Sequence, residues 1–143
     1  MSAPRLSRRE FLALSCLAFS DATASSWIRR APRRGPLGPH PTPRPGIDAS
    51  HVLKDDAIKG GKDVIAAFND VRQIPQIVDG IRCQCGCAKH PEFYSLLSCY
   101  EGPKAMAQTC ETCQAQGRYV FELHTSNKSL DEIRAAIEER YGS

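Results

Sequence analysis

The sequence lacks a long hydrophobic run, has few aromatic residues and contains no familiar catalytic motif. Of its 143 residues, 7% are aromatic, and the apolar stretch Phe11 to Phe19 has nine residues. A membrane-spanning helix needs about 20 apolar residues, so this stretch is too short to be one. No glycine-rich phosphate loop, carboxylate pair with helical or hairpin spacing, or Ser–His–Asp order is present. We therefore expect a binding protein more than an enzyme.

The excess positive charge is confined to the first third of the chain. Residues 1–46 contain eight arginines and two acidic residues, whereas residues 47–143 contain eleven basic and fourteen acidic residues. The longer part of the chain is therefore mildly acidic. A nucleic-acid-binding domain typically has a basic patch with aromatic residues that stack on bases. The charge distribution predicts that nucleic acid is not a partner.

Residues 1–24 have the three parts of an export signal. An arginine-containing start precedes the apolar stretch, and Ala22-Thr23-Ala24 matches a small-x-small cleavage site. The segment SRREFL, from Ser7 to Leu12, resembles the twin-arginine export motif, although Ala13 replaces a common lysine. Cys16 lies within this signal, and we expect it to be lost on cleavage. The predicted location is the periplasm or the outer face of the cytoplasmic membrane, with membrane contact only through an uncleaved signal.

The rest of the chain divides into a linker and one small domain. Residues 25–48 are rich in proline and arginine. Because proline fixes φ and has no N–H donor, we expect an extended, disordered linker in which His40 is solvated. Residues 49–143 are predicted to form a small all-α domain of about four to five helices that carries a cysteine cluster.

Apolar spacing and helix-terminal residues locate the expected helices. Pro75, Pro91 and Pro103 are each predicted to open a helix. Ser129 and Glu132 match a capping box, in which each side chain accepts a hydrogen bond from the other's backbone N–H. Only the segment VFELH, at 120–124, has strand character. The expected helices cover about 63–71, 75–80, 91–100, 103–124 and 130–141.

Six cysteines lie within residues 83–113, in the order C-x-C-G-C, then one cysteine, then C-x-x-C. They are Cys83, Cys85, Cys87, Cys99, Cys110 and Cys113. Gly86 is expected to permit a tight curl that aims three thiols at one point. Soft thiolates select Cu(I), Zn(II) or iron–sulfur clusters. All six cysteines are therefore candidate metal ligands, and His90 is a candidate nitrogen ligand.

The separation of the cysteines along the chain predicts which of them bind a single ion. Cys110 and Cys113 are expected on one face of a helix, and Cys85 and Cys87 in the curled loop. These two pairs need the least ordering to supply four donors. Cys83 and Cys99 are then expected to bridge a second metal or to form a supporting disulfide, and Met106 to pack in the core.

The expected metal is copper or zinc. Structural zinc sites use C-x2–4-C pairs, which the last two cysteines match and the C-x-C-G-C segment does not. Three such closely spaced thiols suit a low-coordinate ion, so Cu(I) is slightly preferred over zinc. The expected function is that of a metal carrier, a metal buffer or a protein with a structural metal centre.

Two other interpretations of the cysteines stay open. An exported chain with an even number of cysteines often forms a disulfide framework, and this protein would then be an envelope module that binds a protein partner. A thiol–disulfide oxidoreductase would need an activated thiolate at Cys110, which the neighbouring Glu111 disfavours. Twin-arginine cargo folds in the reducing cytoplasm, where a thiolate site can load metal, and this favours the metal interpretation.

The same residues resemble the PCYCGC-motif family of bacterial envelope proteins. The resemblance covers roughly residues 70–142 and is carried by CQCGC, the following histidine, the spacing of the later cysteines and the segment KSLDEIR at 128–134. Arg82 and Gln84 stand where the family has proline and tyrosine. Members are usually supposed to bind metal, so the resemblance implies export and a cysteine metal site. It implies no reaction.

Overall fold

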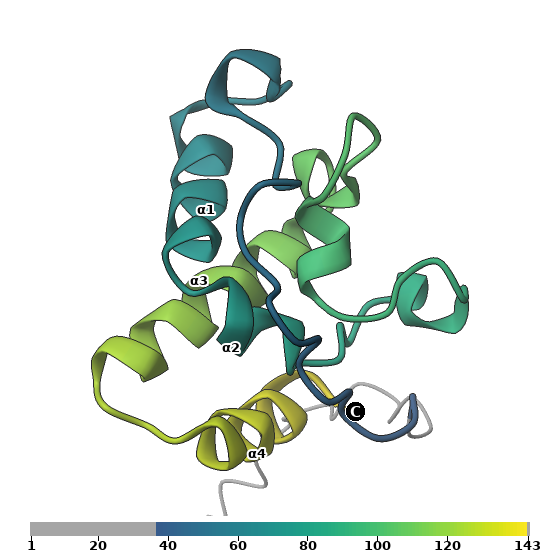
Figure 1. Ribbon diagram of the computed structural model, residues 1–143, viewed down its shortest axis with the longest axis vertical. Helices are drawn as coiled ribbons and strands as arrows, with labels where there is room; N and C mark the ends of the chain where they lie inside the picture. Colours follow the sequence, from purple (N-terminus) through teal and green to yellow (C-terminus); the bar gives the residue numbers. More distant parts are fainter. Residues whose placement is uncertain (1–36, 143) are drawn as a thin grey trace, which may run out of the picture. The chain divides into compact units, whose positions relative to one another are not determined.

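The computed structural model describes residues 37–142 of the chain (Figure 1). The expected export signal and the first part of the expected linker lie outside this range. Residues 37–142 form four α-helices and four short 3-10 helices without a β-strand, and a single bridge joins Val52 to Glu101. The prediction of an all-α domain is confirmed for this part of the chain. No helix in it has the length and apolar character needed to cross a membrane.

Three of the expected helices form where the sequence places them. They are α1 (Lys62–Gln73), α2 (Pro75–Asp79) and α4 (Leu130–Tyr141). Proline occupies the first turn of α2, where its missing N–H has no intrahelical partner to lose. The capping box also forms: the Glu132 N–H donates to Ser129 Oγ at 3.3 Å, and the Ser129 N–H donates to Glu132 Oε2 at 2.8 Å.

Two expected helices, over 91–100 and 103–124, are wrong or too long. Only the 3-10 helix η3 (Leu97–Tyr100) forms within 91–100. Helix α3 (Glu111–Thr125) begins eight residues later than predicted, because Cys110 Sγ accepts the Cys113 N–H and caps the helix there. Gly102, with φ of 73°, turns the chain between η3 and the 3-10 helix η4 (Met106–Gln108). The VFELH segment is helical and belongs to α3.

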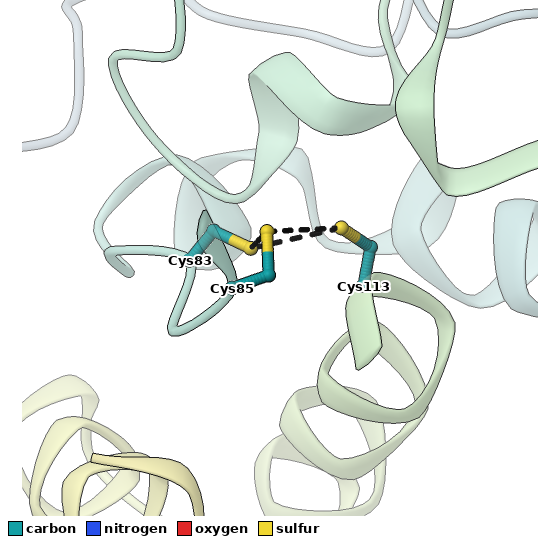
Figure 2. A group of neighbouring side chains, drawn as sticks. All are labelled: Cys83, Cys85 and Cys113. Atoms are coloured by element: carbon teal, nitrogen blue, oxygen red, sulfur yellow. Dashed lines mark hydrogen bonds between the residues drawn. The ribbon is translucent and has the colours of Figure 1, made fainter. Parts of the chain in front are cut away.

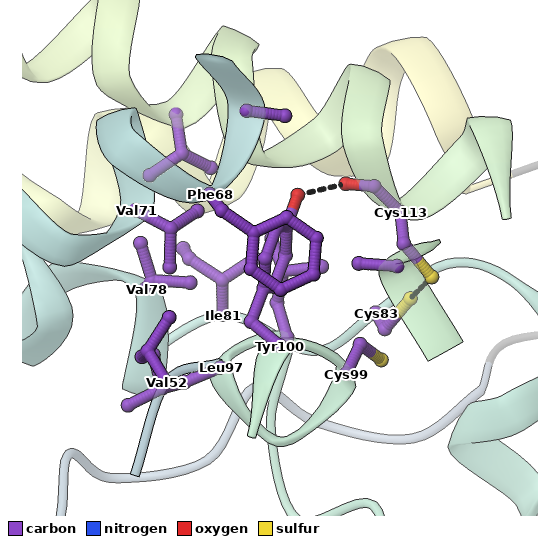
Figure 3. Close-up of a cluster of buried hydrophobic side chains, with 14 of the residues drawn as sticks. Val52, Phe68, Val71, Val78, Ile81, Cys83, Leu97, Cys99, Tyr100 and Cys113 are labelled. Carbon is purple, nitrogen blue, oxygen red and sulfur yellow. Dashed lines mark hydrogen bonds between the residues drawn. The ribbon is translucent and has the colours of Figure 1, made fainter. Parts of the chain in front are cut away.

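The hydrophobic core lies where α1 meets α3, and α4 packs against α3. Phe68 of α1 meets Tyr100 of η3 edge to face, with 4.8 Å between ring centroids. Figure 3 shows these rings beside Val71 and Val78, with the Cys83, Cys99 and Cys113 side chains at one end of the same cluster. The core thus extends directly into the cysteines.

Residues 37–48 lie along this domain and differ from the solvated linker that the sequence predicts. The Arg44 N–H and guanidinium each donate to the fully buried Asp79 carboxylate at 2.7 Å. The His40 imidazole Nδ1 accepts the Arg82 N–H at 2.9 Å, and its side chain is 8% exposed. The Pro41 carbonyl accepts a hydrogen bond from Arg134. Proline-rich backbone has free carbonyls, and the domain uses them as acceptors.

Candidate metal centre

The first three cysteines lie in the segment that follows α2. The Ile81 carbonyl accepts the Leu96 N–H at 2.7 Å. The Gln84 N–H donates to Gln116 Oε1 at 2.9 Å, which ties the backbone between Cys83 and Cys85 to α3. The chain then turns into the 3-10 helix η2 (Gly86–Lys89), and Cys85 Sγ caps it by accepting the Cys87 N–H.

Gly86 contributes less to this turn than the sequence predicts. Its φ is not positive, and a Cβ at this position would meet no atom within 4 Å. The curl comes from the Cys85 cap and the 3-10 turn. Any L-residue can adopt that conformation, so the turn does not use the positive φ that glycine permits.

The last two cysteines lie at the start of α3. Cys110 is the N-cap residue, and Cys113 is the third residue of the helix. The buried Tyr100 hydroxyl donates to the Cys113 carbonyl at 2.7 Å. Cys110 precedes the helix, so the expected rigid pair on one helix face does not form. Cys110 lines an open pocket, whereas Cys113 belongs to a buried group of sulfurs.

Three sulfur atoms converge inside the domain (Figure 2). Cys83 Sγ lies 3.1 Å from Cys85 Sγ, and each lies 3.7 Å from Cys113 Sγ. The three side chains are 1%, 6% and 0% exposed. We call this group the triad. It joins the loop after α2 to the first turn of α3, and its members could hold one metal ion.

Cys99 lies against the triad as a fourth buried thiol. It belongs to η3, is fully buried, and interacts with Cys83, Cys85 and Cys113. It is not one of the three mutually close sulfurs. Figure 3 shows its sulfur below the Cys83 side chain in that view.

The other candidate ligands lie outside the triad. Cys87 and Cys110 are half-buried, and His90 is exposed. All three line one open pocket beside the triad. Met106, expected in the core, is 37% exposed and lines the same pocket. The set expected to bind a single ion, Cys85 and Cys87 with Cys110 and Cys113, therefore differs from the set that the fold brings together.

Electrostatics distinguish the thiols within the group. Hydrogen bonds from Cys113, Cys83 and Cys99 stabilise negative charge on the Cys85 sulfur and lower its pKa far below the usual range. The hydrogen bonds to Cys83, Cys85 and Cys99, together with burial, raise the pKa of Cys113. These hydrogen bonds couple the ionisation of Cys85 and Cys113 and favour the thiolate at Cys85 over the thiolate at Cys113. A soft cation would take the place of the shared protons.

Cys99 and Cys87 hold their protons for different reasons. The hydrogen bond to Cys113 favours the Cys99 thiolate, but hydrogen bonds to Cys83 and Cys85 and burial outweigh it and raise its pKa. Burial, and then the hydrogen bond and charge of Cys85, raise the pKa of Cys87 to about 12. Such thiols bind metal by losing their protons to the medium.

All six cysteines of the described range are free thiols, so the domain is held in this conformation without disulfides.

The sequence did not identify two residues that support the site. Gln116 is fully buried, and its Nε2 has no hydrogen-bond partner. Its spacing from Cys113, one helical turn, was a usable signal. Tyr100 gave no signal in the sequence, because its partner is a backbone carbonyl.

Comparison of the chain with family models, curated proteins and solved structures found no match. The resemblance to the PCYCGC-motif family therefore stays an expectation drawn from residues 70–142. The prediction of a cysteine cluster that could hold a metal ion is confirmed in that coarser form.

Proposed function

We propose that this is an exported protein that binds one soft metal ion, preferably Cu(I), in the triad of Cys83, Cys85 and Cys113, and acts as a metal carrier or buffer. The observation that carries the proposal is the convergence of three buried sulfur atoms within 4.8 Å of one another. They come from segments 28 and 30 residues apart in the sequence. Ordering such distant thiols costs chain entropy, and a bound metal offsets that cost.

The number of close sulfurs supports copper. Structural zinc is almost always bound by four ligands in a tetrahedron, whereas three sulfurs form the mutually close set here. A low-coordinate soft ion such as Cu(I) needs no fourth donor. The dry setting also suits Cu(I), because all three side chains are at most 6% exposed.

Zinc is the second candidate, and Cys99 favours it. With Zn–S bonds of about 2.3 Å, tetrahedral sulfurs lie about 3.8 Å apart. Two of the three separations in the triad are 3.7 Å. Cys99 is buried against the same group, and its approach would complete a four-thiolate structural centre.

The cellular setting rests on the sequence. The twin-arginine-like signal at residues 1–24 supports metal loading in the reducing cytoplasm, followed by export of the folded chain. The resemblance of residues 70–142 to the PCYCGC-motif family supports the same location. Delivery to an envelope protein partner follows from the carrier role.

Elemental analysis of the full chain, expressed in its host and purified without oxygen, tests the proposal. We expect about one equivalent of copper and free thiols after metal removal. Cys83→Ser and Cys113→Ser should lose the metal, whereas the matched control Cys87→Ser should keep it. Metal-free protein without free thiols would refute the proposal in favour of a disulfide framework. One equivalent of zinc that Cys99→Ser abolishes would select the zinc alternative.

A further inference from the structure

A second group of soft donors surrounds an open pocket of about 740 Å³ beside the triad. Cys87 and Cys110 line this pocket together with His90 and Met106. Cysteine and methionine sulfurs are the donors that select Cu(I). The triad uses none of these four residues. Lys104 and Glu92 also line the pocket and contribute one charge of each sign, so it has no net preference for an anion.

Cys85 connects the pocket to the triad, because it belongs to both. The Cys87 N–H donates to Cys85 Sγ at 3.4 Å. At the start of α3, the Cys113 N–H donates to Cys110 Sγ at 3.4 Å. Each pocket cysteine is therefore held within one turn of a triad cysteine, by the chain and by a hydrogen bond.

The triad is poorly accessible by any direct approach. Cys83 and Cys113 are 1% and 0% exposed, and Cys85 is 6% exposed. A donor or acceptor of metal cannot bring its own ligands to sulfurs that are buried this completely. Since Cys85 faces the pocket, the pocket gives the metal a route that does not require the core to open.

We propose that the pocket is an exchange site for Cu(I), in which Cys87 and Cys110, assisted by Met106, bind the ion transiently and pass it to the triad through Cys85. The inference rests on the proposed function, because it requires copper in the triad. Each step is a ligand exchange: the bond from copper to a pocket sulfur breaks as a bond to a triad sulfur forms. Copper stays Cu(I), and each thiol that binds releases its proton to water. The exchange site makes the protein a carrier, since a structural centre needs no such route.

The kinetics of copper release test the exchange site. The full chain, purified without oxygen, is loaded with one equivalent of Cu(I), and transfer to excess bathocuproine disulfonate is followed by absorbance. The Cys87→Ser/Cys110→Ser variant should keep its equivalent of copper and transfer it about tenfold more slowly. Serine at position 110 can still cap α3 in place of the cysteine, and Cys85, which caps η2, is unchanged. Met106→Leu, which preserves size, should slow transfer by a smaller factor than the double variant. The control Glu139→Gln, at an exposed position of α4, should transfer at the native rate.

The outcomes separate this inference from the proposed function. Native-rate transfer by the double variant, with copper retained, would overturn the exchange site and leave the triad proposal standing. Loss of copper from the double variant would also overturn it, because both cysteines would then be resident ligands. A native chain that retains no Cu(I) would refute the triad proposal itself. If the double variant fails to fold by far-UV circular dichroism, the Cys87→Ser and Met106→Leu single variants decide the matter in the same assay.

Discussion

The helical core and the cysteine segment of this domain are built in different ways. Helices α1, α3 and α4 have 12 to 15 residues and pack through fully buried apolar side chains. The cysteine segment, residues 81–110, contains only 3-10 helices of three or four residues. Turns this short have little stability of their own. The core therefore fixes where the segment attaches, and a few buried polar contacts, with the proposed metal, fix where its sulfurs point.

Gly117→Ala should cause the largest change, because it acts where the two regions meet. A Cβ at Gly117 would lie 2.2 Å from the Tyr100 hydroxyl oxygen and 2.9 Å from a Val71 methyl. The same hydroxyl holds the Cys113 carbonyl. Overpacking of this kind costs about 3 kcal/mol, more than the gain of about 1 kcal/mol from replacing glycine within a helix. We expect a lower free energy of unfolding in urea denaturation and weaker metal binding.

Gly86→Ala is the matched control for this variant. A Cβ at Gly86 meets no atom within 4 Å, so stability and metal content should stay at native levels. If both alanine variants behave alike, the close packing of Tyr100 on α3 does not couple core and site as we describe.

Asp79→Asn should have the next largest effect, because it loosens the attachment of residues 37–48. The Asp79 carboxylate is fully buried and accepts hydrogen bonds from Arg44 and from the Ser95 hydroxyl. Removing one partner of a buried ion pair costs about 3 kcal/mol or more. The Arg44 side chain is 39% exposed and can be rehydrated, so we expect about 2 kcal/mol. An unchanged melting temperature would mean that this segment adds nothing to the domain.

The same carboxylate predicts how stability depends on pH. Burial alone would raise the pKa of Asp79, but the hydrogen bonds from Arg44 and Ser95 outweigh it and lower the pKa below the usual value. The stabilisation is therefore fully present above the unfolded pKa of about 3.9 and is lost as pH falls through the lower folded value. Urea titrations between pH 6 and pH 2 should show a shallower acid loss for Asp79→Asn than for the native chain.

Gln116→Ala should affect the metal site more than the core. It leaves the buried Gln84 N–H without its acceptor, which costs about 1 to 2 kcal/mol. Losing such a supporting residue lowers metal affinity about tenfold or more. Gln116→Glu keeps an acceptor oxygen and serves as the comparison in a competition assay with a Cu(I) chelator. Equal affinities for the alanine variant and the native chain would show that the loop needs no anchor on α3.

Ser129→Ala should have the smallest effect, and only on the core. It removes the N-cap acceptor of the Glu132 N–H in α4, which typically costs about 1 kcal/mol. Because α4 contributes no cysteine, metal content and copper transfer should be unchanged. A loss of metal from this variant would mean that the two regions are not separable.

The difference between the regions also explains what could be predicted from the sequence. Helices α1, α2 and α4 were predictable because their signals are local. These signals are the apolar spacing around Phe68 in α1, the proline at the start of α2 and the capping box at Ser129 before α4. Residues 91–110 have the same apolar spacing, but the Cys110 cap and the turn at Gly102 stop them from joining α3. The first is a hydrogen bond to a sulfur atom and the second is a backbone angle. The periodicity of apolar residues indicates neither of them.

The cysteine cluster itself was predictable from the spacing of its thiols, but its membership was not. Sequence proximity favoured Cys87 and Cys110, whereas the fold brings Cys83 beside Cys113. The choice depends on Gln116, which ties the loop after α2 to α3, and on Tyr100, which ties η3 to the Cys113 carbonyl of α3. Long-range anchors of this kind appear only once the helices are placed.

X-ray absorption spectroscopy at the copper edge of the full, Cu(I)-loaded chain identifies and counts the ligands of the bound ion. We expect one copper ion bound by three sulfur atoms, with this shell lost in Cys83→Ser and kept in Cys87→Ser. A shell of nitrogen or oxygen donors, or a three-sulfur shell that survives Cys83→Ser and disappears in Cys87→Ser, would contradict this expectation.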